Sequence, residues 1–263
     1  MMMKQITSRD NARYKEFKLL ATSAGARRKF GKTVFDGVHL AQSFLTQRGQ
    51  PECAVVSESA LQNNEVHALL ESCQNVFVLS DVLFHPLRQV EHGVDLFFIA
   101  ALPKAEFSGV LTENALILDG LQDPGNLGSI LRSAAGAGIT QVFCSEGTCT
   151  AWSPKVLRAG MGAHFALSIY ENVDLLSLIQ RSQIPVLATS SHTKQTIFQA
   201  HLNRPLAWLF GHEGQGVSAA LMELASETVT IPQNPNIESL NVAAAAAICM
   251  FEQVRQQLHV TAT

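Results

Sequence analysis

Short apolar runs alternate along the chain with longer segments in which apolar residues recur at helical spacing. In the N-terminal part this pattern predicts strands at residues 33–35, 53–56, 76–79 and 94–101, and helices at 37–47, 65–73 and 82–90. Strands that alternate with helices are typical of a small α/β sandwich. Residues 103–114 contain Pro103, Gly109 and several polar side chains, so we interpret them as a linker.

The second half alternates more clearly. Strands are predicted at residues 115–118, 141–144, 165–169, 185–189, 206–210 and 228–231, with helical segments between them. Such repetition predicts a mostly parallel sheet with helices on both faces. The last helix is expected to run from Ser239 to about Leu258. Its alanines at 243–247 would allow close packing on the sheet or on a second subunit, although helix propensity explains them equally well.

Length and composition favour two α/β domains, at residues 1–102 and 115–263, because 263 residues with 47% hydrophobic content can form more than one core. The longest apolar run, 242–251, is too short to span a membrane, and the N-terminus does not resemble a secretion signal. We therefore expect a soluble, cytoplasmic protein. The five cysteines form no CxxC pair and the nine histidines are scattered, so we predict reduced thiols and no metal site.

Charge is distributed unevenly. Residues 1–35 hold nine Lys and Arg against two acidic residues, whereas the remainder holds ten against twenty, and the formal net charge is −3. Clustered positive charge is typical of phosphate binding, although a solvated helix face is an equally good explanation. Gly25 and Gly31 favour an exposed loop between them. The candidate RNA contacts are Arg27, Arg28, Lys29 and Lys32.

Three segments could form a functional site. The first, LDGLQDPGNLGSILRSAAGAG at residues 118–138, places turn-forming residues and a small-residue helix directly after an apolar strand. Asn126 is a candidate cap for that helix, and Arg132 is the only full charge between Pro124 and Gly138. The other two segments are LFGHEGQGVS at 209–218 and IPQNPNIESLNV at 231–242.

Within the second segment, residues 214–219 fit a loose GxGxxA pattern, which raises the possibility of a nicotinamide-dependent oxidoreductase. A dinucleotide fingerprint normally opens the first βαβ unit and has an acidic residue about twenty positions later. Here most strands precede the pattern, and the nearby acid, Glu238, falls in a predicted loop. The position therefore argues against dinucleotide binding.

Taken in this order and at this spacing, the three segments resemble the motifs of the SpoU/TrmH branch of the SPOUT RNA methyltransferases. These enzymes transfer a methyl group from S-adenosylmethionine to a ribose 2'-hydroxyl. The resemblance covers nearly the whole chain. It implies a C-terminal trefoil knot, a homodimer formed through the C-terminal domain, and an N-terminal RNA-binding domain of ribosomal-protein-like fold, whose opening resembles FDGVHLAQSFL at residues 35–45.

The resemblance also implies site residues. Catalytic positions are matched by Asn126, Arg132, Glu213, Ser239 and Asn241, and cofactor positions by Thr189, Gly211, Gly216, Ile231 and Leu240. Because arginine stays protonated, we expect Arg132 to hold a phosphate and to stabilise charge on the 2'-oxygen. Glu213 would orient Arg132 or accept a proton through water. Simpler explanations are core packing for Ile231 and Leu240, a surface position for Glu213, and helix capping for Asn126 and Ser239.

The sequence departs from the usual third motif. Gln233, Pro235 and Ala243 replace a methionine, a glycine and a serine, which could change the flexibility of the cofactor loop. We expect an RNA 2'-O-methyltransferase acting on ribosomal RNA. A transfer RNA substrate and a non-catalytic RNA-binding factor for ribosome assembly are the alternatives. The intact polar set favours catalysis.

Overall fold

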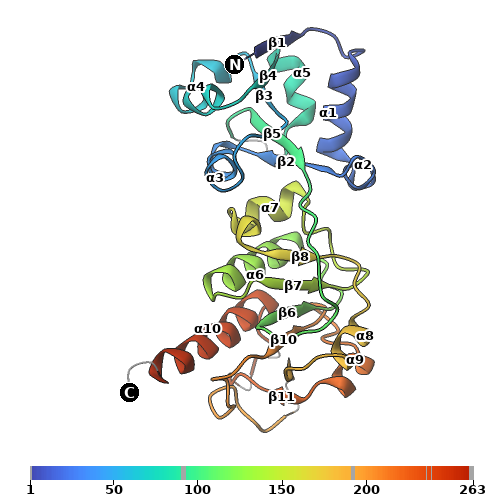
Figure 1. Ribbon diagram of the computed structural model, residues 1–263, viewed down its shortest axis with the longest axis vertical. Coiled ribbons are helices and arrows are strands. Elements are labelled where there is room, and N and C mark those ends of the chain that lie inside the picture. Colours follow the sequence, from blue (N-terminus) through green and yellow to red (C-terminus); the bar gives the residue numbers. More distant parts are fainter. Residues whose placement is uncertain (1, 90–92, 191–192, 235, 238, 261–263) are drawn as a thin grey trace. The chain divides into compact units, whose positions relative to one another are not determined.

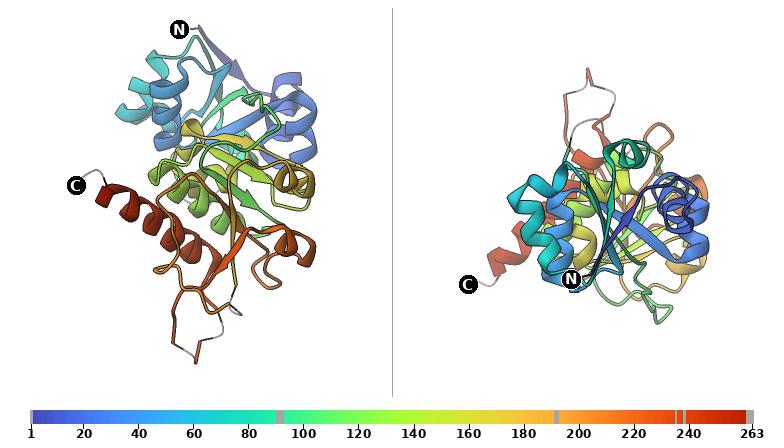
Figure 2. Two further views of the ribbon diagram at one scale, coloured as in Figure 1. Left: turned by 60° about the horizontal axis from the view of Figure 1, so that its bottom comes forward. Right: turned by 90° about the horizontal axis from the view of Figure 1, so that it is seen from above.

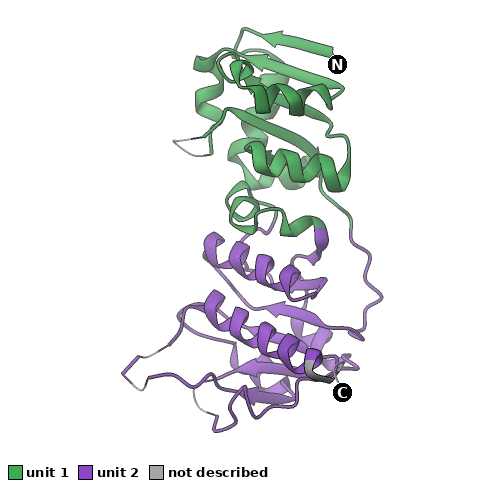
Figure 3. Cartoon of the chain, turned by 90° about the vertical axis from the view of Figure 1, so that its left-hand side faces the viewer, with its two compact units in different colours: residues 1–104, 152–165 green, residues 105–151, 166–263 purple. Residues whose placement is uncertain are grey.

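The computed structural model describes residues 2–89, 93–190, 193–234, 236–237 and 239–260. The chain forms two compact units (Figure 3): residues 1–104 with 152–165 make unit 1, and residues 105–151 with 166–263 make unit 2. Segment 152–165, expected within the C-terminal domain, therefore groups with the N-terminal residues. Within unit 1, the Thr33 hydroxyl donates to the Trp152 carbonyl at 2.7 Å, and Arg158 forms an ion pair with Asp36 at 2.7 Å.

Unit 1 is built on a five-stranded mixed sheet with the order β1-β4-β3-β5-β2. Its strands are β1 (Met2–Ile6), β2 (Lys32–Asp36), β3 (Cys53–Ser57), β4 (Asn75–Leu79) and β5 (Leu96–Ala101). Strand β5 is antiparallel to β2 and β3, and the remaining pairs are parallel. The helices are α1 (Ala12–Thr22), α2 (Ala24–Phe30), α3 (Val38–Arg48), α4 (Asn64–Glu71), α5 (Asp81–Phe84) and α7 (Pro154–Gly160) (Figure 1). Short 3₁₀ turns lie at Ala60–Gln62, His85–Leu87 and Ala163–Ala166.

Two expectations for unit 1 were wrong. Residues 24–30 form a helix rather than a loop, because Ser23 caps its first turn and Gly31, at φ +61°, ends it in the left-handed conformation. The helix predicted at 82–90 stops at Phe84 and continues only as a 3₁₀ turn, since Pro86 cannot extend an α-helix. Val90 lies outside the described residues.

Unit 2 contains a six-stranded sheet with the order β11-β9-β10-β6-β7-β8, and every pairing among its described strands is parallel. The strands are β6 (Ala115–Leu118), β7 (Gln141–Cys144), β8 (Ser168–Tyr170), β9 (Val186–Thr189), β10 (Ala207–Phe210) and β11 (Glu227–Val229). This confirms the predicted mostly parallel α/β sheet. The strand predicted from residue 165 was wrong at its start, because Ala163–Ala166 forms a 3₁₀ turn.

Helices cover both faces of this sheet (Figures 1 and 2). They are α6 (Pro124–Gly136), α8 (Leu175–Gln180), α9 (Ala219–Leu224) and α10 (Val242–Val260). Ile117 and Leu209 pack with residues of α8 and α9. Trp208, which points to the opposite face because strand residues alternate, donates from Nε1 to Gln253 of α10 at 2.9 Å. None of the helices in the described residues combines the length and apolar character that a membrane span needs.

The parallel arrangement brings the three sequence segments to one edge of the sheet. Strands β6, β9, β10 and β11 all end there, so the loops that follow them share that edge. Strands β6 and β10 are neighbours in space but distant in sequence, and the strand order reverses between them. Ligands of open α/β sheets bind outside such a switch point.

Candidate active site

Helix α6 begins at the end of β6 with the sequence Asp-Pro-Gly-Asn. Asp123 caps this helix, since its Oδ1 accepts from the backbone N–H of Asn126 at 2.8 Å. The expected capping role of Asn126 was therefore wrong. The reason is Pro124, which favours the first helical position and keeps the preceding residue extended, as an N-cap residue must be. Asn126 lies inside the first turn, and its side chain is available for other contacts.

A chain of three polar side chains joins the three sequence segments. Asn241 donates from Nδ2 to Oδ1 of Asn126 at 2.9 Å, and Asn126 donates from its own Nδ2 to Oε1 of Glu213 at 3.2 Å. The sequence-predicted residues Asn126, Glu213 and Asn241 therefore lie together, on α6, the loop after β10, and the start of α10. We call them the Asn-Asn-Glu chain.

The Glu213 carboxylate is held by backbone groups as well. The N–H groups of Gln122 and Asp123 donate to its two oxygens at 3.1 and 3.0 Å. Burial acts to raise the pKa of Glu213, but these N–H groups stabilise the carboxylate and leave the pKa below the ordinary value for glutamic acid. Glu213 is therefore ionised near neutral pH, which makes it an acceptor of hydrogen bonds and a weak base.

Asn241 has a second contact, which sets the start of the last helix. Its Oδ1 accepts from the backbone N–H groups of Ala243 and Ala244 at 2.9 and 3.2 Å, as an N-cap side chain does. Helix α10 therefore begins at Val242 and not at Ser239, and the expectations that Ser239 caps the helix and that Asn241 lies just inside it were wrong. The side chain of Asn241 both caps α10 and orients Asn126.

The loop after β10 is a tight turn stabilised by its own backbone. His212 and Gly216 exchange backbone hydrogen bonds of 3.0 and 2.8 Å. A Cβ on Gly211 would lie 2.2 Å from the backbone of Gly216, so a glycine is required there. Its role in the structure is to let the loop fold on itself. His212, for which the sequence predicted no role, closes the turn, because its Nδ1 accepts from the N–H of Gly214 at 3.0 Å.

Asp119, which was not among the predicted site residues, fixes this loop to the end of β6. Its Oδ2 accepts from the backbone N–H of Ser218 at 3.0 Å. An acidic residue immediately after a buried strand was the available signal. Together with the Glu213 contacts, this bond joins the first and second sequence segments at two points.

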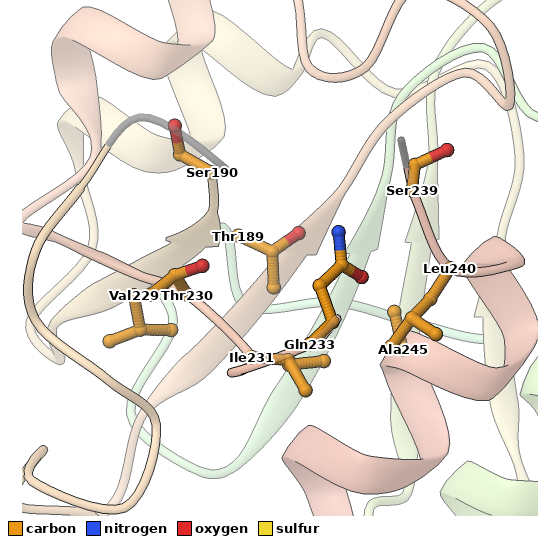
Figure 4. Close-up of a pocket in the computed structure, with 9 residues that line it drawn as sticks. All are labelled: Thr189, Ser190, Val229, Thr230, Ile231, Gln233, Ser239, Leu240 and Ala245. Atoms are coloured by element: carbon orange, nitrogen blue, oxygen red, sulfur yellow. The ribbon is translucent and has the colours of Figure 1, made fainter. Parts of the chain in front are cut away.

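A cavity of about 140 Å³ lies between the ends of β9 and β11 and the start of α10 (Figure 4). It is lined by Thr189, Ser190, Val229, Thr230, Ile231, Gln233, Ser239, Leu240 and Ala245. Three of the five predicted cofactor residues, and the predicted catalytic Ser239, therefore lie together. Gly211 and Gly216 do not line this cavity. Figure 4 shows the amide of Gln233 directed among these side chains, and its Nε2 donates to the Ile237 carbonyl at 3.3 Å.

Arg132 stands apart from the Asn-Asn-Glu chain. It is exposed on α6, and among the described residues it has no hydrogen-bond or ion-pair partner. It lies six positions after Asn126 on the helix, which corresponds to roughly 120° around the axis and about 9 Å along it. Within one chain the structure therefore does not bring Arg132 to Asn126 or Glu213. Pro235 and Glu238 of the third segment lie outside the described residues.

The four candidate RNA contacts have different environments. Arg27 is only 8% exposed and donates from Nη1 to the Leu20 carbonyl at 2.9 Å, and burial lowers its pKa. The expectation that Arg27 lies in an exposed loop was wrong, because it is buried on a helix, and its contact with RNA stays a prediction. Lys32 pairs with Glu52 at 2.7 Å and with Glu16 at 3.3 Å. Arg28 and Lys29 are exposed on α2.

The cysteines offer no reactive thiol of lowered pKa. All five are free. Burial raises the pKa of Cys53 and Cys249 to about 12 and that of Cys149 to about 11, so these thiols stay protonated near neutral pH. Among the described residues, no three His, Cys, Asp or Glu side chains are grouped so that they could hold a metal ion.

Comparison with known proteins gives a consistent result. Residues 113–251 match the model of the SpoU rRNA methylase family. The chain is 32% identical to an uncharacterized tRNA/rRNA methyltransferase of Synechocystis over 96% of its own length and 94% of the relative. It is 29% identical to the 23S rRNA (guanosine(2553)-2'-O)-methyltransferase RlmP of Bacillus subtilis over 95% and 98%. A crystal structure of an RNA 2'-O ribose methyltransferase superimposes with a TM-score of 0.82 at 30% identity, covering 97% of this chain and all of the other.

Proposed function

The chain belongs to the SpoU rRNA methylase family, and we propose that it transfers a methyl group from S-adenosylmethionine to a ribose 2'-hydroxyl of ribosomal RNA. One observation carries this proposal: the Asn-Asn-Glu chain joins all three family segments beside the cavity at the carboxyl edge of the unit 2 sheet. A site that no longer catalysed a reaction would have no physical need for such a connected polar set, which argues against a non-catalytic assembly factor.

The residues around the cavity fit an adenosine-type cofactor. The apolar walls that a base needs come from Val229, Ile231 and Leu240. Hydroxyl groups for polar contacts come from Thr189, Ser190 and Ser239. At about 140 Å³ the cavity is smaller than the ~300–1,000 Å³ of typical ligand sites, so these residues would hold one part of the cofactor. When bound, S-adenosylmethionine supplies the electrophilic methyl group. Gly211 and Gly216 would then contribute by shaping the neighbouring loop.

The protein's own residues have three tasks in this proposal. Asn126 and Asn241 fix the approach of the ribose by hydrogen bonding, because their side chains are already oriented by Glu213 and by the α10 backbone. Glu213 keeps Asn126 in place, and its low pKa makes it unsuited to accept the 2'-hydroxyl proton. Arg132 binds the phosphate beside the target nucleotide and stabilises charge on the 2'-oxygen.

The separation of Arg132 from Asn126 within one chain favours a homodimer whose site uses both copies. Helices α6 and α10 lie side by side, since a Cβ on Gly136 would meet the Phe251 ring at 3.6 Å. Phe251 is 47% exposed and Ile248 is 37% exposed, so α10 presents apolar side chains that a second copy would cover. We assign the dimer contact to these helices. We also infer that the final segments of the chain thread a loop to form the trefoil knot of the family.

The domain roles follow the same proposal. Residues 115–263 carry the methyltransferase site, and residues 1–102 hold the RNA, with 103–114 as the linker. The exposed Arg28 and Lys29 on α2 support RNA binding by the N-terminal part. Ribosomal RNA is favoured over transfer RNA by the family match and by the relative from Bacillus subtilis, which acts on 23S rRNA.

The test is methyl transfer with purified components. The protein is incubated with tritiated S-adenosylmethionine and, separately, with large-subunit rRNA, small-subunit rRNA and tRNA from cells that lack its gene. We expect label in rRNA, at a ribose 2'-oxygen when sites are mapped. Label in tRNA alone would mean that tRNA, and not rRNA, is the substrate. Cofactor binding by calorimetry without label in any RNA would contradict the enzymatic assignment, as would the absence of saturable cofactor binding.

A further inference from the structure

A second cavity, of about 390 Å³, lies in unit 1 where the N-terminus of α1 meets strands β1, β3 and β4. Its volume falls in the ~300–1,000 Å³ range of small-molecule sites. Lys4, Gln5, Asn11, Arg13, Asn75 and Phe77 are among the residues that line it. None of them belongs to the predicted RNA contacts, all of which lie between residues 27 and 32.

The fold places two cations beside one aromatic ring in this cavity. Lys4 of the edge strand β1 is the parallel partner of Phe77 in β4, so both side chains project from the same face of the sheet. Lys4 Nζ lies 5.9 Å from the centroid of the Phe77 ring, and Arg13 Cζ lies 5.9 Å from the same centroid. These distances are within the range of cation–π contacts.

Among the side chains that line the cavity, Lys4 and Arg13 are positive and Glu52 is negative, which leaves a net charge of +1. The carboxylates of Glu16 and Glu52 are paired with Arg13 and Lys32, at distances of 2.7 to 3.8 Å. Lys4 has no carboxylate partner among the described residues. The first turn of α1 holds no acidic side chain, so no carboxylate within that turn offsets the partial positive charge of the helix end.

Polar groups with unused hydrogen-bonding capacity complete the lining. Asn11 uses its Oδ1 to cap α1, which leaves its Nδ2 as a donor. Asn75 donates from Nδ2 to the Glu52 carbonyl at 3.3 Å, which leaves its Oδ1 as an acceptor. A donor and an acceptor beside two cations can recognise a polar ring or sugar that carries a phosphate.

We propose that this cavity binds a single nucleotide, with its phosphate between Lys4 and Arg13 and its sugar or base edge against Asn11 and Asn75. Resting on the proposed function, we assign that nucleotide to an unpaired segment of the substrate RNA. The bound segment would hold the RNA on unit 1 by contacts that are independent of the methyl-transfer site.

Binding of a fluorescein-labelled oligouridylate to the full-length protein tests the proposal. Lys4→Ala should weaken binding roughly tenfold, about 1.4 kcal/mol, and should reduce the slope of log K against log salt by about 0.7, the value for one single-strand phosphate contact. Lys15→Ala is the matched control: it removes the same charge from exposed surface of α1, where Lys15 pairs with Asp10 and does not line the cavity. It should leave the slope nearly unchanged.

Two further measurements separate the possible outcomes. Addition of 5'-UMP to labelled protein should shift the side-chain amide NMR signals of Asn11 and Asn75, and these shifts should be lost in Lys4→Ala. Equal effects of Lys4→Ala and Lys15→Ala on oligouridylate would overturn the site in favour of diffuse attraction, and saturable UMP binding without any oligouridylate binding would overturn the RNA assignment. Arg13→Lys, which keeps the charge, guards against misfolding. Cofactor binding and methyl transfer are measured separately, so failure of this site does not resemble failure of the enzyme.

Discussion

Asn126 and Glu213 lie 87 positions apart in the sequence, and a 3.2 Å hydrogen bond from Nδ2 of Asn126 to Oε1 of Glu213 joins them. The contact exists because β6 and β10 are adjacent parallel strands whose following loops share one edge of the sheet. Glu213 also accepts two backbone N–H groups from the turn that precedes Asn126. The carboxylate therefore acts as the connection between the first and second family segments.

Replacing this carboxylate should affect catalysis more than folding. In Glu213→Gln, an amide group would face the three N–H donors now satisfied by the carboxylate, so one donor would meet another donor. We expect kcat to fall about 100-fold through misplacement of Asn126, with little change in cofactor affinity. Methyl-transfer kinetics and calorimetry measure the two effects. An unchanged kcat would remove Glu213 from the site.

The lowered pKa of Glu213 predicts how this contact responds to acid. A carboxylate whose folded-state pKa lies below its unfolded value stabilises the fold above the unfolded pKa and loses that effect as pH falls through the folded pKa. The NMR signals of the Asn126 side-chain amide should therefore stay constant from neutral pH to below the ordinary range of glutamic acid, and then shift. A transition near neutral pH would contradict the assignment. In Glu213→Gln the signals should not titrate.

Two substitutions at Asn241 separate its capping role from its contact with Asn126. Asn241→Asp keeps an oxygen for the N–H groups of Ala243 and Ala244 but removes the donor to Asn126. Its free energy of unfolding should stay within about 0.5 kcal/mol of the wild-type value, and most methyl transfer should be lost. Asn241→Ala should lose activity and also about 1 kcal/mol of stability. Chemical denaturation and initial rates distinguish them. If both variants are equally stable, the capping role is wrong.

Much of unit 2 could be predicted from sequence because its strands are short, apolar and bounded by turn residues. Ala115–Leu118 and Gln141–Cys144 have the same limits in the prediction and in the structure. Strand β1 was missed because only Ile6 of its five residues is buried, so an edge strand of this kind has no apolar pattern. Helix α1 could have been predicted from the sequence, since Tyr14, Phe17 and Leu20 recur at a spacing of three and are buried on one face of the helix.

Side-chain connections were harder to predict than strands. Both Asp123 and Asn126 are good helix caps, and only the effect of Pro124 on its neighbour decides between them. The burial of Arg27 could not be read from a run of three basic residues, because it depends on where the helix turns against α1. That the Asn-Asn-Glu chain forms at all depends on strand order, which local sequence does not specify.

The requirement for glycine at position 211 predicts a sharp contrast within one loop. A Cβ at Gly211 would lie 2.2 Å from backbone atoms of Gly216, whereas one at Gly214 would meet only the His212 ring at 3.8 Å. Gly211→Ala should lower the free energy of unfolding by about 1–3 kcal/mol and abolish methyl transfer. For Gly214→Ala, the free energy of unfolding should stay within about 0.5 kcal/mol of the wild-type value. Thermal unfolding and activity measure both. Equal behaviour of the two variants would contradict the close approach.

The proposed dimer predicts an effect of charge on the exposed face of α10. Phe251→Asp should produce monomers in analytical ultracentrifugation and reduce methyl transfer in parallel, because an aspartate cannot be buried there without a partner. Phe198 is 58% exposed in the same unit but lies outside α10, so Phe198→Asp is the control and should remain dimeric and active. A dimeric Phe251→Asp protein would exclude this face from the interface.

Arg132 gives the most direct test of the catalytic assignment, because its loss breaks no hydrogen bond or ion pair among the residues that the structure describes. The side chain is exposed and has no hydrogen-bond or ion-pair partner among the described residues. The free energy of unfolding of Arg132→Ala should therefore stay within about 0.5 kcal/mol of the wild-type value, and its cofactor affinity should be unchanged. Methyl transfer should be lost. Arg132→Lys should not restore it, since an ammonium cannot reproduce the two parallel hydrogen bonds of a guanidinium to phosphate.

A mixing experiment then locates Arg132 relative to the Asn-Asn-Glu chain. Arg132→Ala and Asn241→Asp proteins should each be inactive alone. If the site uses both copies, a mixed dimer contains one pairing in which Arg132 of one protomer faces an intact Asn-Asn-Glu chain in the other, and mixing should restore up to about half of the activity per mixed dimer. If Arg132 acts within its own chain, no mixed dimer has a complete site and the mixture stays inactive. Recovery would therefore explain why the single chain holds Arg132 away from Asn126.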